Sequence, residues 1–191
     1  MINVNQVASW FVKNNHILAN EKFDNHLLFM CMLAKVAFHV KNIEVNYGQA
    51  TFENGYLNFS EFLDKNAEFE FNEKETHILK SINKYYGYYT FDDLLSNYWI
   101  EQFLLNICTE NSKISDVAMY ASLTHTVSRA LLFYQDCTLD EYVIIENDNV
   151  FFVENNIKLT AKEKKELKAI EPGEQKIFNV FRDNEESLVI M

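Results

Sequence analysis

Two runs of hydrophobic residues near the start of the chain predict two helices of different character. Between Asn3 and about Ala19 the apolar residues recur at helical spacing with polar residues between them, which is typical of an amphipathic helix. Between Phe23 and Val40 most residues are apolar, on every side of the expected helix. A helix without a polar face is poorly suited to water, so we expect this second helix to be the central element of the fold.

The pattern up to residue 136 predicts further helices. The helical periodicity is lost in residues 41–58, which predicts a loop. Whether this loop contains a small hairpin is left open. The expected helices are a short one at Phe59–Leu63, one over Asn72–Tyr86 ended by Gly87, one or two over Thr90–Ile107, and one from Ser115 to Tyr134. We therefore expect a mainly α fold, a compact helical bundle around the central apolar helix with a small β-hairpin.

Residues 137–191 have a different pattern from the helical body. The expected elements are a β-hairpin of Tyr142–Ile145 and Val150–Val153, a short helix opened by a capping box of Thr160 and Glu163, and strands at Lys176–Phe181 and Ser187–Ile190. The sequence thus predicts a helical domain over residues 1–136 and a mixed α/β C-terminal extension over residues 137–191.

Composition narrows the class of molecule. Of 191 residues, 48% are hydrophobic, so the chain can bury a sizeable core without disulfides. The 17 basic and 28 acidic residues give a formal net charge of −11, and only Arg129 and Arg182 are arginines. Because nucleic-acid binding relies on clustered basic residues, we expect no direct nucleic-acid binding.

Cysteine usage and hydropathy bear on the compartment. The three cysteines are an odd number without metal-ligand spacing, so we expect reduced thiols. The start of the chain lacks a signal-peptide pattern, and no apolar run reaches about 18 residues. We therefore expect a cytoplasmic protein without a membrane segment. The oligomeric state is left open.

No residue pattern predicts catalysis, a cofactor or a metal. None of the five histidines falls in a ligand-spaced pair, and no glycine-rich phosphate-binding motif occurs. Ser122 and Ser128 lie near His125 in sequence, but a hydroxyl on the same helix is not a nucleophile without an oriented base. The adjacent Asp92 and Asp93 fit ordinary partners of a helix dipole. We expect a protein that is not an enzyme.

The sequence feature that most favours a function is a cluster of aromatic residues around Gly87. It comprises Tyr85, Tyr86, Tyr88 and Tyr89, followed by Phe91, Tyr98 and Trp99. Tyrosine is common among the residues that contribute most to protein interfaces, and it also covers cores next to helix ends. Core and partner-surface roles are both left open for these rings.

The order of four sequence blocks resembles the Panacea domain, a small helical module of phage-associated proteins and of antitoxins in toxin–antitoxin systems. The blocks are Val4–Val12, Leu27–Ala34, Glu53–Leu57 with Phe59 and Phe62 behind it, and Tyr86–Ser96 with Trp99 behind it. They are similar to the family's opening helix, its second helix, its Gly-Pro-Val loop and its tyrosine-glycine turn. The resemblance covers roughly residues 3–105 and leaves residues 106–191 unassigned.

The resemblance implies a partner surface. It adds Tyr56, in the loop block, to Tyr85, Tyr86, Tyr88 and Tyr89 as candidate partner-binding residues. The chain departs from the family where both lysines of the second-helix motif are replaced by Leu27 and Met30, and where Tyr56-Leu57 replaces Pro-Val. If the family's residues at these positions contact a partner, this chain has lost that contact or changed its partner.

The resemblance implies an antitoxin-like protein-binding module that neutralises a cognate toxin by direct binding. The alternative is an inhibitor, encoded by a phage or mobile element, whose acidic surface occupies the nucleic-acid channel of a host defence nuclease. The even spread of acidic residues argues against a dedicated DNA mimic. Two classes of protein remain: an enzyme without a familiar signature and a transcriptional regulator. The lack of a basic recognition helix argues against the regulator.

Overall fold

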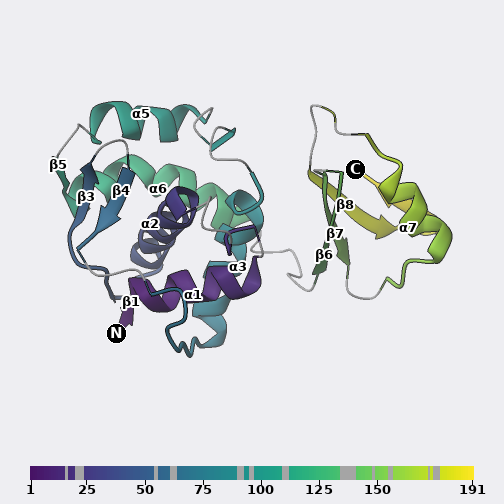
Figure 1. The fold of residues 1–191 in the computed structure, drawn as a ribbon, viewed down its shortest axis with the longest axis horizontal. Coiled ribbons are helices and arrows are strands. Elements are labelled where there is room, and N and C mark those ends of the chain that lie inside the picture. Colours follow the sequence, from purple (N-terminus) through teal and green to yellow (C-terminus); the bar gives the residue numbers. More distant parts are fainter. Residues whose placement is uncertain are drawn as a thin grey trace. The chain divides into compact units, whose positions relative to one another are not determined.

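The chain divides into two compact units, Met1–Cys137 and Thr138–Met191, each of which is described by itself (Figure 1). The computed structural model describes residues 1–15, 17–19, 24–53, 56–60, 64–89, 93–94, 97–108, 112–133, 141–147, 149–154, 157–171, 173 and 177–191. These residues form six helices and three β-sheets.

The fold class is mixed α/β, and the expectation of a mainly α bundle with one small hairpin was wrong. The chain is 51% helical and 20% strand. The difference arises from the short strands of the first unit, whereas the four strands of the second unit lie where the sequence predicts them. Strands of two to four residues leave too short an alternation for a sequence pattern to reveal.

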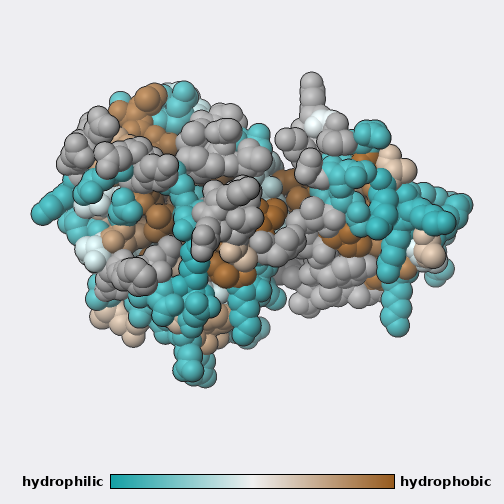
Figure 2. All heavy atoms as spheres, viewed as in Figure 1, coloured by the Kyte–Doolittle hydropathy of each residue, from teal (hydrophilic) through white to brown (hydrophobic). Residues whose placement is uncertain are grey.

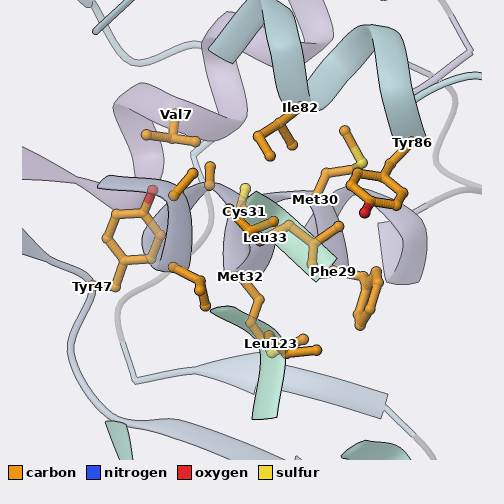
Figure 3. Packing of buried hydrophobic residues seen from close by; sticks show 14 of the residues in the cluster. Val7, Phe29, Met30, Cys31, Met32, Leu33, Tyr47, Ile82, Tyr86 and Leu123 are labelled. Carbon is orange, nitrogen blue, oxygen red and sulfur yellow. The ribbon is translucent and has the colours of Figure 1, made fainter. Parts of the chain in front are cut away.

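The described helices of the first unit comprise a buried central helix and the helices packed around it. They are α1 (Val4–Asn14), α2 (Asp24–Val40), α3 (Glu73–Tyr86), α5 (Tyr98–Asn106) and α6 (Asp116–Phe133). The central helix α2 packs against α1, α3 and α6. Figure 3 shows its side chains between Val7 of α1, Ile82 of α3 and Leu123 of α6. The apolar run in α2 follows from this position, because every side of the helix meets another element.

Capping boxes fix where two of these helices begin. At α1 the Asn3 side chain accepts from the backbone N–H of Gln6 at 3.0 Å, while Gln6 accepts from the backbone N–H of Asn3 at 3.1 Å. Asn72 and Glu75 make the same reciprocal pair at the start of α3. Each pair satisfies backbone N–H groups that have no partner within the helix.

The strands of the first unit form two small sheets. In one, β1 (Ile2–Asn3) pairs in parallel with β2 (Val45–Asn46). In the other, β3 (Ala50–Glu53) lies between β4 (Tyr56–Phe59) and β5 (Ser112–Ile114), antiparallel to both. Phe59 therefore belongs to a strand and does not begin the short helix expected at Phe59–Leu63, whose last three residues lie outside the described part of the chain.

The second unit is a four-stranded sheet with one helix. Its elements are β6 (Glu141–Glu146), β7 (Asn149–Glu154), α7 (Ala161–Lys168), β8 (Ile177–Arg182) and β9 (Leu188–Ile190). The strand order is β6-β7-β8-β9, with β7 and β8 parallel and both outer pairs antiparallel. Leu167 of α7 packs on Phe151, Val153 and Val180 of the sheet, so this unit has its own core.

Candidate partner-binding site

The end of α3 is tied to α1 by a buried polar junction around Gly87. The Asn15 side-chain amide donates to Asn83 Oδ1 at 2.9 Å and to the carbonyl of Gly87 at 2.9 Å. A Cβ at position 87 would lie 2.3 Å from Asn83 Oδ1, 2.7 Å from the Asn83 carbonyl and 2.8 Å from Asn15 Nδ2. Gly87 has a φ of −71°, so close approach, and not left-handed backbone, requires a glycine here.

Tyr86 extends the junction into the core. Its hydroxyl donates to the carbonyl of Thr126 at 2.9 Å, which links α3 to α6. Its own carbonyl lies 3.3 Å from Nε2 of the buried His26, which links α3 to α2. Only 3% of Tyr86 is exposed, and burial raises the pKa of its hydroxyl above the ordinary value. The structure therefore places this predicted partner-binding residue in the core.

The other predicted tyrosines differ in exposure. Tyr85 and Tyr88 are half-buried, and the Tyr85 ring meets the Tyr86 ring edge-on at 4.7 Å between centroids. Burial raises the pKa of Tyr88, opposed by a hydrogen bond to the Asn83 side chain. Tyr89 is 42% exposed. Tyr56 lies in β4, and its side chain falls outside the described part of the structure. Among the predicted tyrosines whose side chains the structure describes, Tyr89 is thus the one most accessible to a partner.

Helix α5 adds exposed apolar side chains that the sequence analysis missed or only named in passing. Tyr98 and Leu105 are 61% and 66% exposed, and their spacing of seven residues, two helical turns, places them on one side of α5. Hydrophobic residues reach the surface over α5 in Figure 2. Tyr98 stood at the end of the aromatic run, whereas nothing in the local pattern distinguishes Leu105 from the buried Phe103 near it.

An ion pair between a buried lysine and an exposed aspartate joins α2 to the start of α6. Lys35 Nζ lies 2.7 Å from Asp116 Oδ1, with side chains 3% and 50% exposed respectively. The ammonium also lies 5.8 Å from the centroid of the buried Tyr47 ring. Within the described residues the Tyr47 hydroxyl has no hydrogen-bond partner. Since Lys35 is matched in charge and enclosed by core residues, this pair fits a structural role.

The ionisable groups of the described residues do not gather into a metal-binding group. Among these residues, no three His, Cys, Asp or Glu side chains lie close enough together to hold a metal ion. Cys31 and Cys108 are buried free thiols, and burial raises the pKa of Cys108 to about 12. A buried thiol with a raised pKa stays protonated and is a poor nucleophile.

A groove lies between α1 and the chain that follows β4. It has a volume of about 600 Å³ and is lined by Ser9, Val12, Lys13, Lys65, Asn66, Ala67, Glu68 and Phe69. The Ser9 hydroxyl donates to the carbonyl of Asp64 at 3.2 Å, which holds the two sides together at one end. Lys13 Nζ lies 5.3 Å from the centroid of the Phe69 ring, and Lys65 forms an ion pair with Asp24.

Among the chain's described helices, none has the length and apolar character needed to cross a bilayer. No protein-family model, curated protein or solved structure matches the chain.

Proposed function

We propose that this chain is an antitoxin-like, protein-binding module that neutralises a cognate toxin by direct binding and catalyses no reaction. The observation that carries the proposal is the exposure of large apolar side chains on the first unit, at Tyr89, Tyr98 and Leu105. Exposed aromatic residues of this kind are frequent anchors in protein interfaces. The resemblance to the Panacea domain supports the same function. We propose a cytoplasmic location as part of this function.

The charge of the chain supports a partner with a basic surface. A net charge of −11 attracts a positively charged protein and speeds its encounter. A toxin with a basic surface would fit that description, and so would the alternative partner, a defence nuclease with a basic nucleic-acid channel. We place the toxin first because acidic residues are spread evenly along the sequence, which argues against a dedicated DNA mimic.

Affinity purification of the tagged chain from the organism that encodes it tests the proposal. We expect a stoichiometric small basic protein, whose toxicity on expression alone is relieved by the chain. Copurification of a nuclease, released by competing DNA, would favour the alternative inhibitor. Absence of any stoichiometric partner would contradict both.

Substitutions locate the binding surface. We expect Tyr89→Ala and Tyr98→Ala each to weaken binding of the purified partner by more than about 1 kcal/mol while the melting temperature changes little. The control is Tyr86→Phe, which removes the hydrogen bond to Thr126 in the core and should lower stability without changing affinity. Unchanged affinity in both alanine variants would remove these rings from the interface.

A further inference from the structure

The segment Ala67–Phe71, between β4 and α3, has the form of a strand that pairs with no other strand in the described part of the chain. Its side chains alternate, with Ala67, Phe69 and Phe71 half-buried and Glu68 and Glu70 exposed. The rings of Phe69 and Phe71 stack at 5.6 Å between centroids, as side chains two residues apart do on one face of an extended chain. No turn or bend interrupts the segment.

The backbone of this segment is unpaired within the described structure. The sheet pairings and the backbone hydrogen bonds of the described residues include none from the N–H or C=O groups of Ala67–Phe71. Among the described residues, the nearest backbone N–H groups that donate to a side chain are those of Asn66, before the segment, and Asn72, after it. A row of unpaired backbone groups on an extended segment is a template on which another strand can pair.

The groove beside α1 provides the room for such a strand. Five consecutive residues, Lys65–Phe69, form one wall of the groove, and Ser9, Val12 and Lys13 of α1 form the other. A volume of about 600 Å³ is in the range of sites that enclose a short ligand. The apolar groups of Val12, Ala67 and Phe69 line it, so inward-facing side chains of an added strand would meet an apolar surface.

The charge of the segment defines the outward-facing side chains of its partner. Glu68 and Glu70 are exposed two residues apart, so they lie on the same face, and exposed Glu73 follows at the start of α3. The groove lysines already have partners, because Lys65 pairs with Asp24 and Lys13 lies over the Phe69 ring. An added strand with Lys or Arg at alternate positions would place its cations opposite Glu68 and Glu70.

We propose that Ala67–Phe71 is a docking strand that binds an extended segment of a partner protein by β-strand addition. The bound segment alternates basic residues, facing Glu68 and Glu70, with apolar residues that enter the groove beside α1. The proposal rests on the proposed function, because it names a second contact of the same protein partner, additional to the exposed side chains of Tyr89, Tyr98 and Leu105, and the chemistry of that contact.

The first test uses synthetic peptides and the full chain. The probe is a capped seven-residue peptide of alternating lysine and valine, titrated by NMR. Two further versions carry N-methyl groups on all lysines or on all valines, which blocks one backbone edge or the other. We expect the parent peptide to bind and to slow amide exchange at residues 67–71. We also expect one methylated version to lose about tenfold or more in affinity while the other retains binding.

Several outcomes would overturn the proposal. The first is equal affinity for both methylated peptides. The second is slowed amide exchange only outside residues 67–71. The third is a higher affinity for a glutamate–valine peptide than for the lysine–valine peptide. A block peptide of the same composition, with all lysines first, measures attraction to the acidic chain alone. It should bind at least about tenfold more weakly than the alternating peptide.

The second test changes the protein. The double substitution Glu68→Lys and Glu70→Lys should lower the affinity for the parent peptide about tenfold or more, because lysines of the protein then face lysines of the peptide. The matched control, Glu171→Lys with Glu185→Lys, makes the same change in net charge at exposed positions of the second unit and should keep most of the affinity. Equal losses in both variants would show that only net charge matters, which overturns the proposal.

The proposed function and the docking strand fail separately. If the chain purifies with a stoichiometric partner and the Glu68→Lys, Glu70→Lys variant retains that partner at unchanged affinity, the docking strand is wrong and the proposed function stands. If no partner copurifies, the proposed function fails, while the peptide titration still decides whether Ala67–Phe71 accepts a strand.

Discussion

Acidification should destabilise the first unit through the protonation of His26. The ring is buried in α2, and its Nε2 lies 3.3 Å from the carbonyl of Tyr86. Because a carbonyl only accepts, Nε2 carries the hydrogen, and Nδ1 is left with a lone pair that has no partner among the described residues. Protonation would place a second N–H and a positive charge in the core without an acceptor.

The size of the effect follows from the pKa. Burial lowers the pKa of His26 from 6.5 to about 4, although the Tyr86 carbonyl opposes the shift. Since the folded-state pKa is the lower one, the unfolded chain binds the proton more readily between these values. The stability contributed by neutral His26 is complete above pH 6.5 and is lost as the pH falls toward 4. The loss is about 2 kcal/mol at pH 5 and about 3 kcal/mol below pH 4.

Denaturant unfolding at about pH 7.5 and about pH 5 measures this loss. The informative variant is His26→Gln, whose amide can still donate to the Tyr86 carbonyl but does not titrate. We expect the wild type to lose about 2 kcal/mol more than the variant between the two pH values. His125→Gln, at an exposed position on α6, is the control. The account of the junction is refuted if wild type and His26→Gln show the same pH dependence.

Two further substitutions test the packing of the first unit. Gly87→Ala should lower the free energy of unfolding by about 2 kcal/mol or more, because a Cβ would collide with Asn83 and Asn15. Gly173→Ala should change the free energy of unfolding by less than about 0.5 kcal/mol, because no described residue beyond its chain neighbours has an atom within 4 Å of the new Cβ. Equal effects of the two substitutions would contradict this. Asp116→Ala should cost about 1–3 kcal/mol by leaving buried Lys35 without its carboxylate, whereas Lys35→Met should be close to neutral. Thermal denaturation compares the pair, and a larger loss in Lys35→Met would reverse the reasoning.

The positions of the long helices could be predicted because their signals are local. The capping residues Asn72 and Glu75 and the apolar spacing within Asn72–Tyr86 together predict a helix, and the structure has α3 at Glu73–Tyr86. The apolar run around Met30–Leu33 predicts a buried helix for the same reason. Such signals depend on side chains within a few residues of one another, so the sequence carries them.

The short strands could not be predicted in full, because β1, β2 and β5 pair with partners that are distant in the chain, whereas β3 and β4 form the small hairpin that the sequence left open. Ala50 pairs with Phe59 but also with Ile114, and the three residues of β5 show no alternation of their own. The pairing of Ile2 with Val45 is equally hidden. Strand order is decided by tertiary packing, which a single sequence does not display.

The candidate site was predicted only in part for a similar reason. Four tyrosines around Gly87 look alike in sequence, yet the structure buries Tyr86 and exposes Tyr89. Tyr86 is the last residue of α3 and its hydroxyl reaches α6, whereas Tyr89 follows the end of that helix, so their exposure depends on tertiary packing that a single sequence does not display. The segment Ala67–Phe71 alternates visibly in sequence, but only the structure shows that no strand among the described residues pairs with it.

The central claim is that the first unit binds another protein through its exposed apolar surface. Its most direct test is the mass of the complex that the tagged chain forms in its own organism, measured by size-exclusion chromatography with light scattering. We predict a species that contains this chain and a second protein in fixed proportion, and that dissociates more readily when Tyr89 and Tyr98 are both replaced by alanine. Recovery of the chain alone, or a complex that both substitutions leave unchanged, would contradict the claim.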